Sequence, residues 1–248
     1  MMQKKAMTTS PHFCKAPIPS RFRRNIVMSH TAHRSTFSRP VVLVRHGATD
    51  WNEAARYQGS TETSLNGTGQ KQVVEVCKGL VALVNNGVLD KFQLQLIHSP
   101  LKRASQSAAI IADALQLPSA TVSIDRRLRE LSMGRWEGLD SAQVKDRFYE
   151  ERKSRKNDRW GFCPEGGDSL ASRCDEVAAC LGEQPPHTII VAHAGILRIA
   201  HHLLGGRSEP EAAALAIPHE EIAWLDSDGW HTLTTRALQQ EDDGRVMD

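Results

Sequence analysis

Three residues at the end of an apolar segment could bind and attack a phosphoryl group. Residues 41–44 read Val-Val-Leu-Val, which predicts a short buried strand, and Arg45, His46 and Gly47 follow directly. In an open α/β sheet, ligands bind just beyond the carboxyl ends of the strands. A guanidinium fits phosphate oxygens, an imidazole can act as a nucleophile, and glycine lets backbone N–H groups approach a ligand. An ordinary strand end with a surface cation would also fit this tripeptide, so the rest of the chain must decide.

A second segment supplies another guanidinium in the same way. Residues 93–98 predict a strand, and Ser99 and Pro100 are expected to open a helix as its N-cap and first residue. Arg103 would then lie in the first turn, where the positive end of the helix dipole favours anions. Alone, Arg103 would be interpreted as a solvated surface cation; its place just past a strand end favours the functional interpretation.

The clearest strand after the first covers residues 188–192 and runs directly into His193. In a chain that alternates strands and helices, the carboxyl ends of the strands gather at one edge of the sheet, so these side chains are expected to meet. Two imidazoles and two guanidiniums would repel one another unless an anion joined them. A phosphate dianion fits, because each charged hydrogen bond contributes about 1.5–3 kcal/mol.

Hydrophobic periodicity predicts an α/β domain in one continuous segment. Helices are expected over residues 68–85, 99–115, 141–155, 168–182 and 195–204, and strands over residues 41–44, 93–98, 122–128, 188–192, 221–226 and 230–235. Polar loops are expected at 52–66 and 160–167. The last two strands flank Ser227-Asp228-Gly229, and Asp-Gly is typical of a hairpin turn.

The first 39 residues differ in composition from the rest. Residues 1–40 contain eight lysines and arginines and no aspartate or glutamate, so this segment is expected to be disordered. It also resembles an organelle transit peptide, and a third interpretation places the true start at Met28. We therefore expect a basic leader at 1–39, one folded domain at 40–238 and a flexible polar tail at 239–248.

Composition argues against several classes of protein. A net charge of +2 and an aromatic content of 5% give no sign of a nucleic-acid partner. The longest apolar segment, 188–200, is too short to span a membrane. The five cysteines form no Cys-x-x-Cys pair, which is typical of reduced thiols in a cytoplasmic protein, with organelle import through residues 1–39 as the alternative. There is neither a carboxylate cluster for magnesium nor a His-x-x-x-His helix for zinc, so no metal is expected.

Five ordered motifs resemble those of the histidine phosphatase superfamily, also called phosphoglycerate mutase-like, in particular its broad-specificity phosphatase branch. They are Arg-His-Gly-Ala-Thr-Asp-Trp-Asn at 45–52 with Gln-Gly at 58–59 and Leu-Asn-x-x-Gly-x-x-Gln at 65–72, Ser-Pro-Leu-Lys-Arg-Ala at 99–104, Leu-Arg-Glu at 128–130 with Gly-Arg-Trp-Glu-Gly at 134–138, Gly-Gly-Asp-Ser at 166–169, and Val-Ala-His-Ala-Gly at 191–195. Two positions depart from the family pattern, Ala48 and Asp168, where glutamate is common; altered peripheral contacts and retained chemistry are expected.

The resemblance implies a three-layer αβα sandwich with a mostly parallel central sheet and a phosphohistidine enzyme. It implies that His46 attacks phosphorus and that Glu130 protonates the leaving oxygen and then activates water. Glu137 is the alternative acid. The remaining implied site residues bind phosphate or substrate: Arg45, Arg103 and His193 with Asn52, and with less force Gln58, Thr49, Gly47 and Ala194.

Three functions follow from this resemblance. The first is a metal-independent phosphomonoesterase acting on a small phosphorylated metabolite, as a monomer or homodimer. The second is a phosphoglycerate mutase, which would need 2,3-bisphosphoglycerate as cofactor; mutases of the family have longer cores and a Leu-Asn-Glu-Arg-type motif, whereas this chain has Leu-Arg-Glu at 128–130. The third is an inactive phosphate-binding scaffold, which the full set of catalytic residue types argues against.

Overall fold

A six-stranded sheet forms the centre of the molecule, with strand order β3-β2-β4-β1-β5-β6. The computed structural model describes residues 40–235, so the predictions for 1–39 and 239–248 lie outside the described residues. The strands are β1 Val41–Arg45, β2 Gln95–His98, β3 Val122–Ile124, β4 Thr188–Ala192, β5 Glu221–Asp226 and β6 Gly229–Thr234. The β3–β2, β2–β4 and β4–β1 pairs are parallel, whereas β5 runs antiparallel to both β1 and β6. Only β5 runs against the other strands, so the predicted mostly parallel sheet is confirmed.

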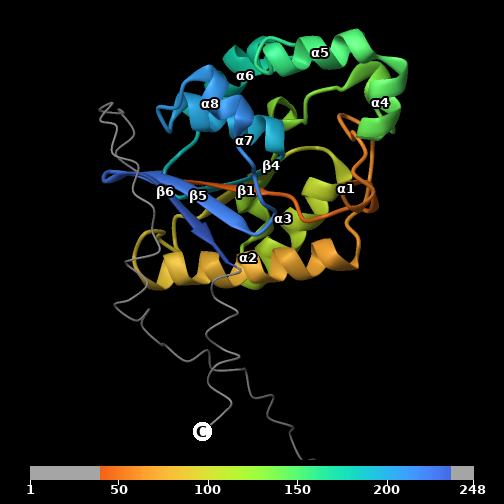
Figure 1. Cartoon of the computed structure of the whole chain (residues 1–248). Helices are drawn as coiled ribbons and strands as arrows, with labels where there is room; N and C mark the ends of the chain where they lie inside the picture. The colour runs from red at the N-terminus through yellow and green to blue at the C-terminus, as the bar shows by residue number, and fades with distance from the viewer. Residues whose placement is uncertain (1–39, 236–248) are drawn as a thin grey trace, which may run out of the picture.

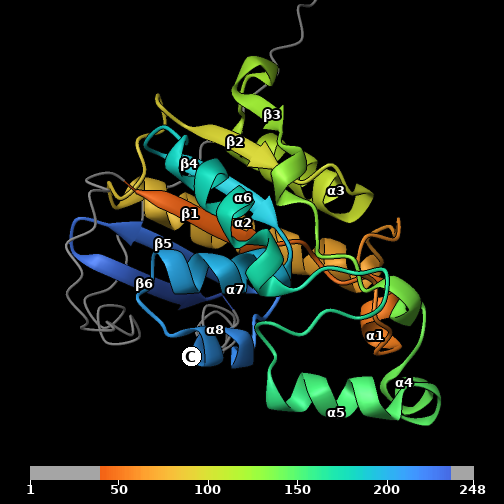
Figure 2. The ribbon, with the colours of Figure 1, turned by 90° about the horizontal axis from the view of Figure 1, so that it is seen from above.

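Helices cover both faces of this sheet (Figure 1). They are α1 Asp50–Glu53, α2 Gly67–Asn85, α3 Lys102–Leu115, α4 Ser141–Arg147, α5 Tyr149–Asn157, α6 Leu170–Gly182, α7 Ala194–Leu203 and α8 Glu209–Ala214. The helices α2 and α3 cover one face, and α6, α7 and α8 cover the other. Figure 2 shows α1, α4 and α5 beyond these layers, on the side toward which β1 points. The predicted three-layer αβα sandwich is therefore confirmed.

The two central strands are almost entirely apolar, apart from Arg45 at the end of β1 and Thr188 at the start of β4, because both of their faces are buried. In β1, Val41 and Leu43 belong to the core under α6, α7 and α8, whereas Val42 and Val44 belong to the core under α2 and α3. All five residues of β4 are buried as well. A strand enclosed on both faces has no polar side to alternate with, which explains the continuous apolar runs in the sequence.

The register of β1 and β4 brings their polar ends together. Arg45 pairs with Ala192, and the next backbone N–H, that of His46, donates to the Ala192 carbonyl at 3.0 Å. On the other side of β4, His98 pairs with Val191, and the Ser99 N–H donates to the Val191 carbonyl at 3.0 Å. Three segments far apart in sequence therefore end at one place on the sheet edge.

The predicted start of the helix over residues 99–115 is wrong. Leu101 is the N-cap of α3, and neither Ser99 nor Pro100 lies inside the helix. The Ser99 hydroxyl, which was expected to cap the helix, contacts His193 and accepts from the Leu101 N–H instead. Arg103 nevertheless lies in the first turn of the helix, as predicted.

Two other predicted elements are shorter than expected. The strand at 122–128 ends at Ile124, because the Asp125 side chain accepts a hydrogen bond from the Arg127 N–H at 2.8 Å and starts a 3₁₀ turn over Arg126–Leu128. The helix at 141–155 is two helices, α4 and α5, divided at Phe148, whose backbone leaves the helical region at φ −135° and ψ 49°. Short helices α1 and α8 were not predicted.

The buried ring of His201 on α7 should make stability sensitive to acid. Its two nitrogens have no hydrogen-bond partner within residues 40–235, and it packs on Trp230. Burial, followed by repulsion from Arg207 and Arg198, lowers the pKa of His201 to about 4. As pH falls below the ordinary histidine pKa, the unfolded chain takes up the proton first, so stability is lost between about pH 7 and pH 4.

We expect His201→Leu to reduce that loss. From pH 7.5 to pH 5, the free energy of unfolding of the variant should fall by about 2 kcal/mol less than that of the unsubstituted protein. Urea unfolding at the two pH values measures this difference. An equal loss of unfolding free energy in the two proteins would show that His201 is not held neutral.

Within residues 40–235, no helix has the length and apolar character needed to cross a membrane.

Candidate active site

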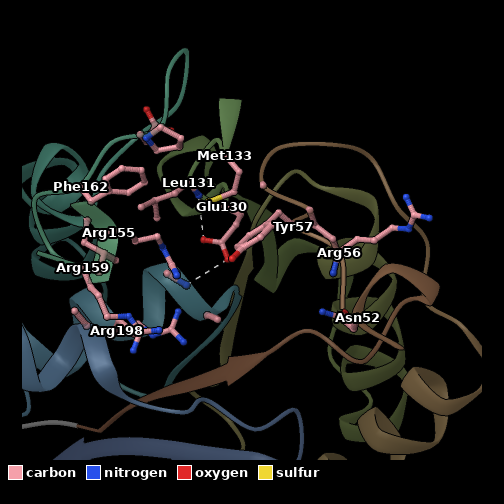
Figure 3. Close-up of a pocket in the computed structure, with 18 of the residues that line it drawn as sticks. Asn52, Arg56, Tyr57, Glu130, Leu131, Met133, Arg155, Arg159, Phe162 and Arg198 are labelled. Atoms are coloured by element: carbon pink, nitrogen blue, oxygen red, sulfur yellow. Dashed lines mark hydrogen bonds between the residues drawn. The ribbon is translucent and has the colours of Figure 1, made fainter. Parts of the chain in front are cut away.

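A cavity of about 290 Å³ opens where β1 and β4 end (Figure 3). Its walls come from β1, the 52–59 loop, α3, the 130–133 segment, α5 with the loop that follows it, and α7. The charged residues that line it are six arginines, Arg45, Arg56, Arg103, Arg155, Arg159 and Arg198, and two carboxylates, Glu130 and Asp168. Aromatic and aliphatic side chains also line it, among them Tyr57, Phe162, Leu131, Met133 and Leu170. An excess of positive charge around a small cavity favours an anionic ligand.

His46 lines this cavity with one ring nitrogen free to react. Its Nδ1 lies 2.7 Å from the Gly47 carbonyl oxygen, which can only accept, so Nδ1 carries the ring proton. Nε2 therefore holds the lone pair, and it accepts a weak hydrogen bond from Arg103 Nε at 3.3 Å. A neutral imidazole with its free lone pair in an anion-binding cavity is the arrangement that a nucleophile requires.

The surroundings of His46 keep this ring neutral. Burial lowers the pKa of His46 well below its ordinary value, and nearby His193, Arg45 and Arg103 lower it further. The centroids of the His46 and His193 rings are 5.0 Å apart, and burial likewise holds the pKa of His193 far below the ordinary value. The lone pair is thus available well into acidic solution.

Two arginines lie beside this ring and form what we call the phosphoryl clamp: Arg103, which is buried, and Arg45, which is half-buried. Arg103 is 1% exposed, and its guanidinium donates to the carbonyl oxygens of Gly59 and Thr61, each at 2.8 Å. Arg45 donates from Nη1 to the Ile217 carbonyl at 2.6 Å, while its buried Nε has no partner within residues 40–235. Burial lowers the pKa of Arg45 to about 10, partly offset by the charge of Glu130. Both guanidiniums remain charged at neutral pH, so an anion beside them would gain strong hydrogen bonds.

His193 is fully buried beside His46, does not itself line the cavity, and has one nitrogen without a partner in the described part of the chain. Its Nε2 lies 2.7 Å from the Ser99 hydroxyl oxygen, and its Nδ1 has no hydrogen-bond partner in the part of the chain described. The Ser99 oxygen also accepts from the Leu101 N–H at 3.3 Å, which leaves the hydroxyl hydrogen free to donate to the imidazole. An unpartnered polar atom in a buried position is costly, and a bound oxygen would relieve that cost.

The side chain of Glu130, from the segment before Leu131, lies against the N-terminus of α7. Its Oε1 accepts from the Leu131 N–H at 3.0 Å, and its Oε2 accepts from the Gly195 N–H at 3.3 Å. A Cβ at position 195 would lie 2.5 Å from Glu130 Oε1 and 2.6 Å from Leu131 Cδ1, so glycine here leaves room for both side chains. The carboxylate is thus fixed at the cavity wall by backbone groups and by the close approach of α7.

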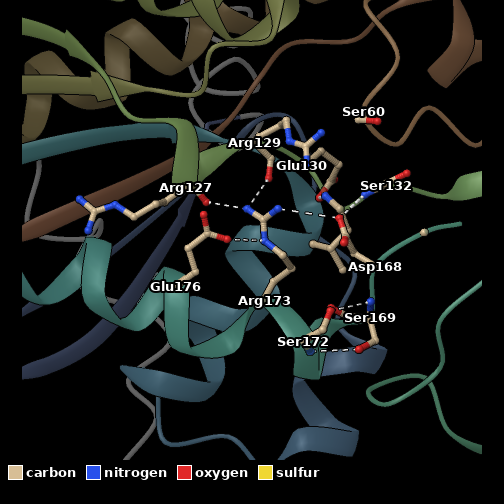
Figure 4. Close-up of polar contacts among 12 residues, drawn as sticks. Ser60, Arg127, Arg129, Glu130, Ser132, Asp168, Ser169, Ser172, Arg173 and Glu176 are labelled. Carbon is tan, nitrogen blue, oxygen red and sulfur yellow. Dashed lines mark hydrogen bonds and ion pairs between the residues drawn. The ribbon is translucent and has the colours of Figure 1, made fainter.

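Buried Arg173 on α6 braces the segment that carries Glu130 (Figure 4). Its Nη2 donates to the carbonyl oxygens of Arg127 and Arg129 at 3.0 and 3.4 Å. Asp168, which replaces the glutamate common in the family, accepts from the Ser132 N–H at 2.8 Å and also lines the cavity. Asp168 therefore makes a structural contact beside the site.

Glu137, the alternative acid, does not line the cavity. It accepts from the Ser60 and Met133 N–H groups at 2.9 and 3.1 Å and from the Thr61 hydroxyl at 2.5 Å. Burial raises the pKa of Glu137, but these hydrogen bonds together outweigh burial and hold it below its ordinary value. Glu137 therefore joins two loops as an ionised group, and the geometry favours Glu130 as the acid.

The weaker predicted contacts divide into two groups. Asn52, Gln58 and Ala194 line the cavity. Gly47 and Thr49 do not: the Thr49 hydroxyl donates to Gln58 Oε1 at 2.9 Å, and a Cβ on Gly47 would lie 2.3 Å from the Gly69 carbonyl oxygen. These two residues position the loop and α2; the close approach that requires glycine at position 47 is to α2.

The sequence patterns did not indicate that His219, Arg155 and Arg198 would lie at or beside the site. His219 Nδ1 donates to the His46 carbonyl at 2.5 Å, and burial, then Arg45, lowers the pKa of His219 to about 4. Arg155 and Arg198 come from helices α5 and α7. None of the three belongs to a motif that marks it, because only the packing of distant elements brings it to the site.

Comparison with known proteins places this fold and site in a family. Residues 41–237 match the histidine phosphatase superfamily (branch 1). Because this match covers most of the 248 residues, the chain belongs to that superfamily, as the motifs predicted. It is therefore an enzyme of phosphoryl transfer. Within residues 40–235, no group of three or more histidine, cysteine or acidic side chains is placed to hold a metal ion.

Similar proteins include phosphatases and a mutase. The chain is 31% identical over 175 residues to glucosyl-3-phosphoglycerate phosphatase of Mycolicibacterium vanbaalenii, covering 64% of this chain and 71% of that protein. It is 32% identical over 166 residues to a metal-independent phosphoserine phosphatase of Arabidopsis thaliana (64% and 65%) and 31% identical over 204 residues to a probable phosphoglycerate mutase of Erwinia tasmaniensis (77% and 89%). The solved mycobacterial glucosyl-3-phosphoglycerate phosphatase with VO3 superposes with a TM-score of 0.63, at 25% identity over 79% of this chain and 97% of that one.

Proposed function

We propose that this protein is a metal-independent phosphomonoesterase that works through a phosphohistidine intermediate. The observation that carries the proposal is the orientation of His46: Nδ1 donates to the Gly47 carbonyl, so Nε2 presents its lone pair to the cavity. This nitrogen attacks phosphorus, and the P–O bond to the substrate alcohol breaks opposite it. Water then attacks the phosphohistidine, and the P–N bond breaks to return neutral His46 and inorganic phosphate.

Buried donors hold the transferring group. Arg45 Nε and His193 Nδ1 have no partner within residues 40–235, so both are free to donate to phosphoryl oxygens. Arg103 already contacts His46 Nε2, so its guanidinium lies where the phosphoryl group would enter. Fixed cations of this kind stabilise the charge on the equatorial oxygens in the transition state without reorganising water.

Glu130 serves as the acid and then as the base. It donates a proton to the leaving alcohol oxygen in the first step and removes one from water in the second. Glu130 lines the cavity together with Arg45, Arg103 and Arg198, and its charge raises the pKa of each of these arginines, partly offsetting their burial.

Gly195→Ala tests the placement of Glu130. The added methyl group would lie 2.5 Å from Glu130 Oε1, so the carboxylate must move. We expect kcat/KM for an alkyl phosphate to fall by about 100-fold, because a displacement near 1 Å at a reacting group costs about that much. Gly182→Ala, at the end of α6 where a Cβ meets no atom within 4 Å, is the control and should retain full activity. Normal activity in Gly195→Ala would contradict this role.

Hydrolysis rather than mutase activity is favoured by the named phosphatases among the relatives, although one relative is named a probable mutase. The names of the three relatives described above refer to phosphoglycerate or phosphoserine compounds, which supports a small phosphorylated metabolite as the substrate. Reaction of 3-phosphoglycerate in ¹⁸O-labelled water decides the matter. The proposal predicts one labelled oxygen in the released phosphate; interconversion of 2- and 3-phosphoglycerate without release, stimulated by 2,3-bisphosphoglycerate, would support the mutase instead.

A further inference from the structure

Side chains from distant elements hold the peptide group that joins His46 to Gly47. A peptide group is planar, so contacts at its C=O and at its N–H together fix the whole group. Its carbonyl, that of His46, accepts from His219 Nδ1 at 2.5 Å. Its N–H, that of Gly47, donates to the hydroxyl of Ser107 on α3 at 3.1 Å. The first peptide group after the nucleophile is therefore held on both sides.

The next peptide group, between Gly47 and Ala48, is held by the His46 ring on one side and by α2 on the other. Its carbonyl is the oxygen to which His46 Nδ1 donates at 2.7 Å. Its N–H, that of Ala48, donates to Oε1 of Gln72 on α2 at 2.8 Å. Gln72 therefore orients, through one rigid group, the oxygen that sets the tautomer of His46.

Glu220 in turn fixes the orientation of Gln72. Gln72 Nε2 donates to Glu220 Oε1 at 2.9 Å, so the amide presents its oxygen to the Ala48 N–H. Glu220 directly follows His219 in the segment before β5, so one short segment supports both peptide groups. Neither Gln72, His219 nor Glu220 lines the cavity. Their contacts therefore act on the loop that carries the nucleophile.

We propose that Gln72 and His219 are positioning residues for the reaction. Through the two peptide groups after His46, they hold its ring with Nε2 toward the phosphoryl group. This inference rests on the proposed phosphohistidine function and adds residues that act on it through the backbone. The attacking nitrogen must be aligned with the P–O bond that breaks, and a displacement of about 1 Å at a reacting group costs about 100-fold in rate.

An exchange of the Gln72–Glu220 pair tests the first contact. In Gln72→Glu at about pH 8, two ionised carboxylates would face each other, so the new side chain is repelled and the Ala48 N–H loses its partner. We expect the single-turnover rate of phosphohistidine formation from p-nitrophenyl phosphate to fall by about 10- to 100-fold. Competitive inhibition by inorganic phosphate should change little, because no residue that lines the cavity is altered.

The double variant Gln72→Glu/Glu220→Gln should recover most of the lost rate. In it the amide and the carboxylate have changed places, so the same two hydrogen bonds can form in the same order. Recovery by a second substitution separates this hydrogen-bond chain from general damage to α2. A folded double variant that is no faster than Gln72→Glu would overturn the role of Gln72.

The tautomer of His46 gives a readout that a general loss of stability would not move. In ¹⁵N NMR of the unsubstituted protein, the His46 ring should carry its proton on Nδ1, with His46→Ala assigning the signal. Gln72→Glu should give a mixture of the two tautomers, and the double variant should restore the single one. An unchanged tautomer and rate in Gln72→Glu would contradict the proposal.

Substitutions of His219 test the second contact independently. His219→Asn places an amide N–H close to the position of the imidazole Nδ1 and should keep most of the single-turnover rate. His219→Leu cannot donate to the His46 carbonyl, and its rate should fall by about tenfold. Equal rates in these two variants would overturn the role of His219. Circular dichroism identifies a variant that does not fold, and the other pair of variants then decides.

Gln70→Glu is the matched control for charge. Gln70 lies two residues earlier on the same helix, is exposed and does not line the cavity, so this variant should keep the full rate. A fall in Gln70→Glu equal to that in Gln72→Glu would assign the effect to charge on α2 and overturn the proposal. An unsubstituted protein that forms no phosphohistidine would instead reject the proposed function, whereas the NMR measurement would still show whether Gln72 sets the tautomer.

Discussion

His46→Ala is expected to lower kcat/KM by about 10⁴- to 10⁶-fold, since loss of a nucleophile removes the whole covalent route. The ring that forms the proposed P–N bond is 3% exposed, and the nitrogen that carries its lone pair is Nε2, which accepts a weak hydrogen bond from Arg103. Denaturation of the enzyme with detergent at alkaline pH during turnover of ³²P-labelled substrate should trap label on the unsubstituted protein. The label should be lost at low pH, as expected for phosphohistidine, and His46→Ala should trap none.

The chain contains a matched control at the next strand end. His98 is also buried, and its Nδ1 lies 2.8 Å from the carbonyl oxygen of the following residue, Ser99, just as His46 Nδ1 contacts Gly47. His98 does not line the cavity. His98→Ala should therefore retain acid-labile label. Trapping of label by His46→Ala would assign the phosphoenzyme to another residue.

Glu130→Gln should have the second-largest effect, and its size should depend on the leaving group. For glycerol 3-phosphate, whose alkoxide cannot leave unprotonated, we expect kcat/KM to fall by about 10²- to 10⁴-fold. For p-nitrophenyl phosphate, the first step needs no proton donor, so kcat/KM should fall much less. Attack of water on the phosphohistidine still needs the base, so a burst of p-nitrophenol followed by a slow steady rate should be seen.

Glu137→Gln distinguishes the two candidate acids. Glu137 accepts hydrogen bonds from the Ser60 and Met133 N–H groups and does not line the cavity, so its replacement should loosen the loops. Any loss of activity in this variant should be the same for both leaving groups and show no burst. If the leaving-group dependence appears in Glu137→Gln instead of Glu130→Gln, the assignment of the acid is wrong.

The sequence by itself determined the fold class and the family of this protein. The apolar runs at 41–44 and 188–192 are legible because a strand buried on both faces must be apolar throughout, and the residues that follow them keep the order of a family motif. The same local logic failed at Ser99 and at 122–128, because side-chain contacts outside the segment, or an Asp125 turn, decided where those elements begin and end.

Only the tertiary structure decided how the site is completed. The register of β1 against β4 sets His46 beside His193, and the close approach of α7 holds Glu130 against Gly195. His219 reaches the backbone of His46, and the arginines of α5 and α7 reach the cavity, through packing between elements that are distant in sequence. The spacing of residues along the chain predicts local geometry. The charge and burial of a cavity depend instead on which distant elements pack together, and a short motif contains no information about that packing.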